Sequence, residues 1–174
     1  MINNNYVHEL DLDLDIDYLK TKIHNVDSEN GEFQQLIEED SYFNNLKLSY
    51  PFLSSKFNIY CSLPKSSIPL HVDANRNCAL NIPLENTKRS FTVFYKFIEP
   101  PILEYNDKFI FNNVRSKVEE TFRFTLTKPT LINNAVPHSV INYSSNQRII
   151  LSWSILPEYT FDQVKNILLN NITF

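Results

Sequence analysis

Two histidines and one aspartate have the residue types and the spacing of metal ligands. His71 and Asp73 stand two residues apart in the run PLHVD, and alternate residues of a strand point to the same side. An imidazole nitrogen and a carboxylate oxygen placed in this way can bind one metal ion. His138, in the later run VPHSV, can add a second imidazole from another strand. The three would then be both the metal ligands and the catalytic residues.

The chemistry of this ligand set points to a particular ion. Two imidazoles and a carboxylate on one face leave the other positions of the metal open for substrate and O₂, an arrangement typical of non-haem Fe(II) oxygenases. Thiolates would favour other metals, but Cys61 and Cys78 stand outside the motif, in apolar runs where buried thiols are expected. We therefore predict Fe(II) and O₂ at this site.

Arg148 follows His138 by ten residues, in the strand-like run QRIILSWSIL. A guanidinium held inside an apolar fold needs an anionic partner, because burying a lone charge is costly. Its planar fork matches a carboxylate with two hydrogen bonds. A dicarboxylate that binds iron at one end would present its other carboxylate to such an arginine.

These residues together resemble a known family. HVD, a distal His in PHSV and an Arg ten residues later look like the 2-oxoglutarate/Fe(II)-dependent dioxygenases, over Lys56 to Leu156. The run HVDANRNCALNIPL is similar to small phage and bacterial members and, more weakly, to the aspartyl/asparaginyl hydroxylase branch. The resemblance implies a double-stranded β-helix that uses 2-oxoglutarate. It also implies hydroxylation of a peptidyl or free amino-acid side chain, with release of succinate and CO₂.

The resemblance also implies residues for the cosubstrate. Arg148 would bind the C5 carboxylate of 2-oxoglutarate, and Asn58 and Tyr60, in the Asn-x-Tyr run, would assist. The family often has a serine two residues after the arginine. Here that position is Ile150, and Ser152 follows on the same face of the strand.

Other polar and aromatic residues have weaker assignments. Arg76 and Asn81 follow the metal motif and could contact a substrate carboxylate or amide, or equally cap turns. His8 and His24 have no partner motif, so we expect both at the solvated surface. Trp153 is expected to pack in the core.

The elements that must position these residues are mostly strands. From residue 56 onward, short β-branched and aromatic runs about ten residues apart indicate a jelly roll. We predict one domain, 1–174, with an all-β core and flanking helices. Its parts are an N-terminal strand and helices (1–55), the jelly-roll core (56–156) and a C-terminal helix (157–174). Within the first part, residues 8–17 alternate as a strand with a solvated acidic face, and 17–26 and 33–46 have helical spacing.

Composition limits the class of protein. Hydrophobic residues make up 43% of the chain and aromatics 13%, which suits a packed core. The net charge of -4 and the absence of a basic block argue against general nucleic-acid binding. They are still compatible with an enzyme that acts on a single nucleobase. There is no signal-like start and no bilayer-length apolar run. A cytoplasmic protein with no membrane partner is therefore expected, either in its own cell or, if phage-encoded, in the host.

Two alternatives stay open at this point. A cupin-like metalloenzyme would keep the metal and would not need Arg148. A non-enzymatic jelly-roll binding protein would use the histidines only as hydrogen-bonded core residues.

Overall fold

The computed structural model describes residues 2, 4–23, 33–36, 40–73, 76–99, 103–105, 109–112 and 117–170. Within these ranges the helices are α1 (Ile16–Thr21), α2 (Ser41–Ser49) and α3 (Phe161–Asn170), with a 3₁₀ turn at Thr87–Arg89. The strands of the first half are β1 (Val7–Glu9), β2 (Phe33–Leu36), β3 (Leu53–Ser62), β4 (Ser67–Asp73), β5 (Cys78–Glu85) and β6 (Ser90–Phe97). Those of the second half are β7 (Leu103–Tyr105), β8 (Phe109–Asn112), β9 (Val118–Phe124), β10 (Thr130–Asn133), β11 (His138–Asn142) and β12 (Arg148–Ile155).

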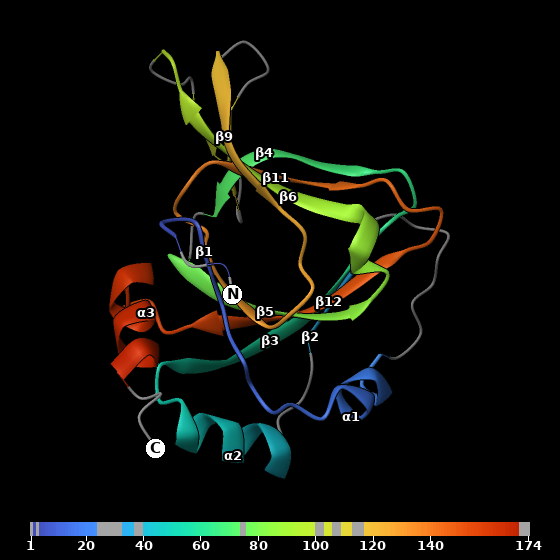
Figure 1. The fold of residues 1–174 in the computed structure, drawn as a ribbon, viewed down its shortest axis with the longest axis vertical. Helices are drawn as coiled ribbons and strands as arrows, with labels where there is room; N and C mark the ends of the chain where they lie inside the picture. Colours follow the sequence, from blue (N-terminus) through green and yellow to red (C-terminus); the bar gives the residue numbers. More distant parts are fainter. Residues whose placement is uncertain are drawn as a thin grey trace.

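The strands form two six-stranded antiparallel sheets (Figure 1). Sheet A has the order β1-β10-β5-β12-β3-β2, and sheet B has the order β7-β8-β4-β11-β6-β9. From β3 to β6, and again from β9 to β12, consecutive strands alternate between the two sheets. This winding is that of a double-stranded β-helix, a cupin-like jelly roll. The predicted fold class, an all-β core with flanking helices, is confirmed.

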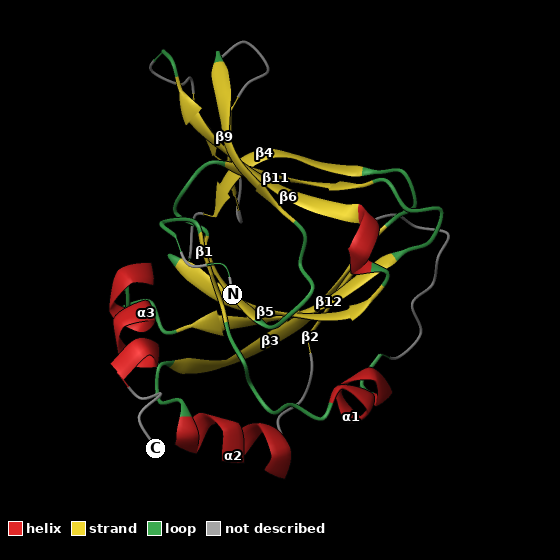
Figure 2. Ribbon diagram, viewed as in Figure 1, coloured by secondary structure: helices red, strands yellow, loops and turns green. Residues whose placement is uncertain are grey.

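The larger hydrophobic core lies on the outer face of sheet A, under the helices. Figure 2 shows α1 and α2 on the side of sheet A that is remote from sheet B, and α3 beside the strand ends at the left. Every second residue of β12, among them Ile149, Leu151 and Trp153, belongs to this core, together with Phe43 of α2 and Val164 of α3. Trp153 is fully buried, as predicted, and its indole N–H donates to the Ser54 carbonyl over 2.6 Å.

The inner face of sheet A, which is turned toward sheet B, carries a smaller apolar cluster. Ile150 of β12 and Ile132 of β10 meet Phe94 of β6 and Phe124 of β9 there. Because side chains alternate along a strand, Arg148 and the other even-numbered residues of β12 share this inner face with Ile150. The sheets therefore turn polar as well as apolar side chains toward each other.

The helices begin at side-chain caps. The Asp15 carboxylate accepts from the backbone N–H of Tyr18 at the start of α1, and Asp40 accepts from the N–H groups of Tyr42 and Phe43 at the start of α2. Such caps satisfy N–H groups that have no partner within the helix. In the described part of the chain, no helix is long and apolar enough to cross a membrane.

The N-terminal part departs from the sequence prediction. Only His8 and Glu9 of the alternating 8–17 run are in a strand, since β1 ends at Glu9, which stands across from Thr130, the first residue of β10. The aspartates beyond it do not form a strand face: Asp11 pairs with Lys128 over 2.8 Å, and Asp15 caps α1. The helix predicted at 17–26 is observed at Ile16–Thr21, and positions 24–26 of that prediction lie outside the described residues.

The helix predicted at 33–46 is wrong in its first half. Phe33–Leu36 forms β2, paired with the edge of β3, and the helix α2 starts only after Asp40. Backbone pairing along a free sheet edge outweighs a helical spacing this short. β7, at Leu103–Tyr105, is a further strand that the sequence did not predict.

His8 is buried, which contradicts its predicted surface position. Only 1% of its surface is exposed, and neither ring nitrogen has a hydrogen-bond partner among the described residues. His24, the other histidine placed at the surface by the sequence, lies outside the described residues.

The burial of His8 predicts acid sensitivity of the fold. Burial lowers the pKa of His8, and Lys165 nearby lowers it further. The unfolded chain therefore binds a proton near pH 6.5 while the folded chain does not, so stability falls as the pH drops below about 6.5. His8→Leu should have a higher Tm than the unsubstituted protein. We expect this difference in Tm to be larger at about pH 5.5 than at about pH 7.5. A gain that is the same at both pH values in thermal melts would refute this.

Candidate metal centre

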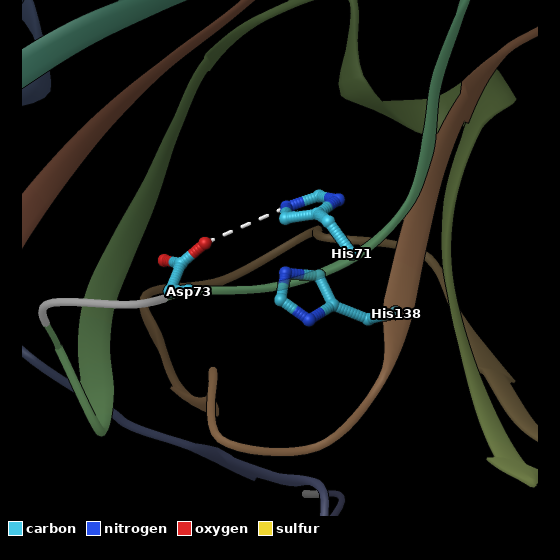
Figure 3. A group of neighbouring side chains, drawn as sticks. All are labelled: His71, Asp73 and His138. Atoms are coloured by element: carbon cyan, nitrogen blue, oxygen red, sulfur yellow. Dashed lines mark ion pairs between the residues drawn. The ribbon is translucent and has the colours of Figure 1, made fainter. Parts of the chain in front are cut away.

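His71, Asp73 and His138 converge from two neighbouring strands of sheet B (Figure 3). His138, the first residue of β11, stands directly across from His71 of β4. The two imidazole centroids are 4.3 Å apart, and His71 Nε2 is 3.5 Å from Asp73 Oδ1. Each residue offers one ligand atom, and these atoms lie within 4.8 Å of one another. All three residues are buried.

Backbone carbonyls fix the orientation of both imidazoles. His71 Nδ1 lies 2.7 Å from the Pro69 carbonyl, and His138 Nδ1 lies 2.8 Å from the Val136 carbonyl. A carbonyl can only accept, so each Nδ1 carries the proton, and the neutral ring has its lone pair on Nε2. Burial lowers the pKa of both residues, that of His138 to about 4 with a further contribution from His71. Both rings are therefore neutral at pH 7, the form that binds metals.

The Asp73 carboxylate is held through one oxygen only. Oδ2 accepts from Arg76 Nε over 2.6 Å and from Asn134 Nδ2 over 2.5 Å. Oδ1, on the side of the imidazoles, is buried and has no hydrogen-bond partner among the described residues. Such an oxygen suits a cation, because a buried carboxylate oxygen needs a partner. The donor set and this oxygen together fit a divalent metal ion.

Arg76 joins the two sheets at this point. Besides Asp73 of sheet B, it donates from Nη1 to Ser152 Oγ of sheet A over 3.0 Å. Its guanidinium carbon lies 5.6 Å from the centre of the Tyr60 ring. Burial alone would lower the pKa of Arg76, but the Asp73 carboxylate and Tyr60 raise it. Arg76 is thus a charged link that holds Asp73 in place.

Removing the Asn134 amide tests how much its hydrogen bond to Asp73 contributes to metal binding. Hydrogen bonds to a metal ligand typically change metal affinity by about 10- to 100-fold. We expect Asn134→Ala to weaken Fe(II) binding by about that factor, as measured by anaerobic titration calorimetry. Asn133→Ala is the matched control, because the Asn133 amide donates to the Asn5 carbonyl and does not contact Asp73. Equal Fe(II) affinities in the two variants would refute the effect.

Arg148 is buried on the inner face, and no ion pair joins it to another described residue. Only 3% of its surface is exposed, and its Nε has no hydrogen-bond partner among the described residues. Burial lowers its pKa to about 10, so it still carries a charge at pH 7. A buried guanidinium in this condition fits an anionic ligand.

The other residues predicted to face the ligands share this inner face. Ser152 of β12 lies between Asn58 of β3 and Asn81 of β5, its partners in the antiparallel register. The Asn81 side-chain oxygen is buried without a hydrogen-bond partner among the described residues. Tyr60 stands across from Ile150, and burial raises its pKa. The structure thus gathers all four residues near the link that Arg76 forms.

Sequence reasoning missed two residues of this region. Asn134 has no motif of its own, and only the structure brings it to Asp73. Ser62 is 2% exposed, and its Oγ has no hydrogen-bond partner among the described residues. Ser62 could have been found from its spacing, because Asn58, Tyr60 and Ser62 alternate along one strand and therefore have their side chains on one face.

Comparisons with known proteins concern the fold. No protein-family model and no curated protein matches the sequence. Among solved structures, oxalate oxidase in complex with the substrate analogue glycolate is 16% identical, with 81% of this chain and 60% of that chain covered and a TM-score of 0.40. A cupin domain from Bordetella pertussis Tohama I is 11% identical, with 72% and 94% covered and a TM-score of 0.36.

A third similar structure is E. coli ycfD. It is 10% identical, with 87% of this chain and 42% of that chain covered and a TM-score of 0.48. The chain therefore spans 60% of the length of the oxalate oxidase chain and less than half of ycfD. The chain has a cupin-like jelly-roll fold, which its own strand order and winding establish.

Proposed function

We propose that this protein is an Fe(II)- and 2-oxoglutarate-dependent dioxygenase that hydroxylates an amino-acid side chain. The observation that carries the proposal is the buried guanidinium of Arg148, whose Nε has no hydrogen-bond partner among the described residues. It lies on the inner face of the same jelly roll that brings His71, Asp73 and His138 together. A metal centre alone does not need a buried cation, whereas a dicarboxylate cosubstrate does.

The metal would be held by His71 Nε2, Asp73 Oδ1 and His138 Nε2. When bound, Fe(II), 2-oxoglutarate and O₂ supply the oxidising power, with succinate and CO₂ as products and one oxygen atom inserted into a C–H bond. The protein fixes the ligand atoms before the metal arrives. The two carbonyl bonds hold the imidazole tautomers, and Arg76 and Asn134 bond to Asp73 Oδ2, so that Oδ1 is the oxygen that would bind the metal.

The cosubstrate would be oriented by the polar side chains of the inner face. Arg148 would bind the C5 carboxylate with its charged fork, and Tyr60, Asn58 and Ser152 would line the path between that carboxylate and the metal. The apolar cluster around Phe94, whose ring centre is 5.9 Å from that of His138, would exclude water beside the metal. Exclusion of water strengthens the charge pairs of such a site.

The prime substrate that we propose is a peptidyl or free amino acid. The buried, unpartnered Asn81 oxygen is suited to accept a hydrogen bond from a substrate amide or amine. The net charge of -4 does not favour a nucleic-acid substrate. A small-molecule cosubstrate and a protein or amino-acid substrate are thus the proposed partners.

Succinate formation tests the proposal. The purified protein, loaded with Fe(II) under anaerobic conditions, is supplied with 2-oxoglutarate and O₂ and then with pools of peptides, amino acids or nucleotides. We expect succinate release that requires 2-oxoglutarate and is stimulated by the peptide or amino-acid pool. Fe(II) binding without any 2-oxoglutarate turnover would favour a cupin-like metalloenzyme of another kind, and absence of metal binding would favour a binding protein.

A further inference from the structure

Ser62 lies beside Arg148 on the inner face of sheet A. The two residues are direct partners in the antiparallel register of β3 and β12. Cys61, the neighbour of Ser62, packs in the outer core under the helices, whereas Tyr60 packs against the inner cluster. Ser62 must therefore point inward, as Tyr60 does. Ile149 and Ile150 fix the direction of Arg148 in the same way.

Both residues have a buried polar atom without a partner. Ser62 Oγ and Arg148 Nε lack hydrogen bonds to any described residue, and so they do not bond to each other. The Ser62 carbonyl already has a partner, since it accepts from Asn142 Nδ2 over 3.2 Å. Two unpartnered donors on adjacent strands fit one acceptor group between them, because buried polar groups are nearly always paired.

The neighbouring inner-face positions do not offer the same pair. Ile150 has no polar atom. Ser152 stands four residues from Arg148, about 13 Å along the strand, and its Oγ already accepts from Arg76. Tyr60 stands beside the same Arg76. Ser62 is therefore the hydroxyl placed to act together with Arg148.

We propose that Ser62 and Arg148 together bind the carboxylate of 2-oxoglutarate that is remote from the metal. Arg148 supplies the charge, and Ser62 donates its hydroxyl proton to one carboxylate oxygen. The inference rests on the proposed function. On this inference Ser62 of β3 contributes to specificity, because it favours a cosubstrate with a second carboxylate over a 2-oxo acid that lacks one.

A comparison of two 2-oxo acids tests this assignment. The Fe(II) protein is titrated anaerobically with 2-oxoglutarate and with pyruvate, which lacks the remote carboxylate, and the visible band of the metal-bound keto acid is followed. We expect Ser62→Ala to raise the Kd for 2-oxoglutarate by about 10- to 100-fold, as for the loss of one hydrogen bond to a charged group. The Kd for pyruvate stays unchanged. Ser62→Cys, with a weak donor of similar shape, falls between.

Ser90→Ala is the matched control. Ser90 is also a buried strand serine, but its hydroxyl donates to the Thr87 carbonyl over 2.9 Å, so both Kd values should equal those of the unsubstituted protein. A Ser62→Ala variant that binds 2-oxoglutarate normally, or that loses pyruvate equally, overturns the inference and leaves the proposed function standing. If the unsubstituted Fe(II) protein binds neither acid, the proposed function fails and the inference fails with it.

Discussion

His71→Ala and His138→Ala are each expected to abolish Fe(II) binding. Loss of an outer hydrogen bond to a ligand costs about 10- to 100-fold in metal affinity, so loss of a ligand should exceed about 100-fold. No other described histidine, cysteine or acidic residue joins the group to replace the lost imidazole. Titration calorimetry under anaerobic conditions measures the affinity, and metal analysis after desalting gives the stoichiometry.

The controls for this prediction separate binding from folding. Both histidines face inward on sheet B, outside the larger core, so far-UV circular dichroism should be unchanged. Asp73→Gly keeps two imidazoles, and we expect it to retain some iron while hydroxylation collapses. Full iron stoichiometry in either histidine variant would show that the ligand assignment is wrong. Undiminished hydroxylation in Asp73→Gly would show that Asp73 is not a metal ligand.

Arg148→Ala is expected to raise the Kd for 2-oxoglutarate by about 30- to 1,000-fold. A buried, charge-assisted contact with a carboxylate is worth roughly 2–4 kcal/mol, which converts to that range. Fe(II) affinity should stay near that of the unsubstituted protein, because Arg148 belongs to sheet A and the metal ligands to sheet B. Anaerobic titration, followed by the visible band of the iron-bound keto acid, measures the change.

Arg148→Lys adds a test of geometry. Lysine keeps the charge and loses the planar fork, so its Kd should lie between those of the unsubstituted protein and Arg148→Ala. Unchanged 2-oxoglutarate binding by Arg148→Ala would end the cosubstrate assignment. It would leave a cupin-like metalloenzyme that does not use 2-oxoglutarate as the better explanation of the metal centre.

The β region could be predicted from the sequence because its signals are local. Short runs rich in β-branched and aromatic residues mark the core strands, and a spacing of two puts His71 and Asp73 on one face. The approach of His138 was inferred from chemistry, and the register of β4 and β11 accounts for it. Arg148 was placed inside the fold for a similar reason, and it is buried there.

The N-terminal part could not be predicted in the same way, since its structure depends on distant partners. Phe33–Leu36 is a strand only because the edge of β3 accepts it. The burial of His8 likewise depends on distant segments, since β1 pairs with β10 and Lys165 of α3 lies near enough to lower the pKa of His8. Asn134 reaches Asp73 across 61 positions of sequence, and no period or motif within one segment reports such a contact.

The division between the two cores separates what holds the protein together from what it does. Most of the large buried side chains lie between sheet A and the helices, whereas the metal group, Arg148 and Ser62 lie on the inner faces. A substitution among the inner polar residues removes little apolar burial, which is the main source of stability. Such a jelly roll can exchange its ligand-facing side chains without crossing the threshold of unfolding. If the proposed function holds, selection can change substrate preference here in single steps, without prior stabilising substitutions.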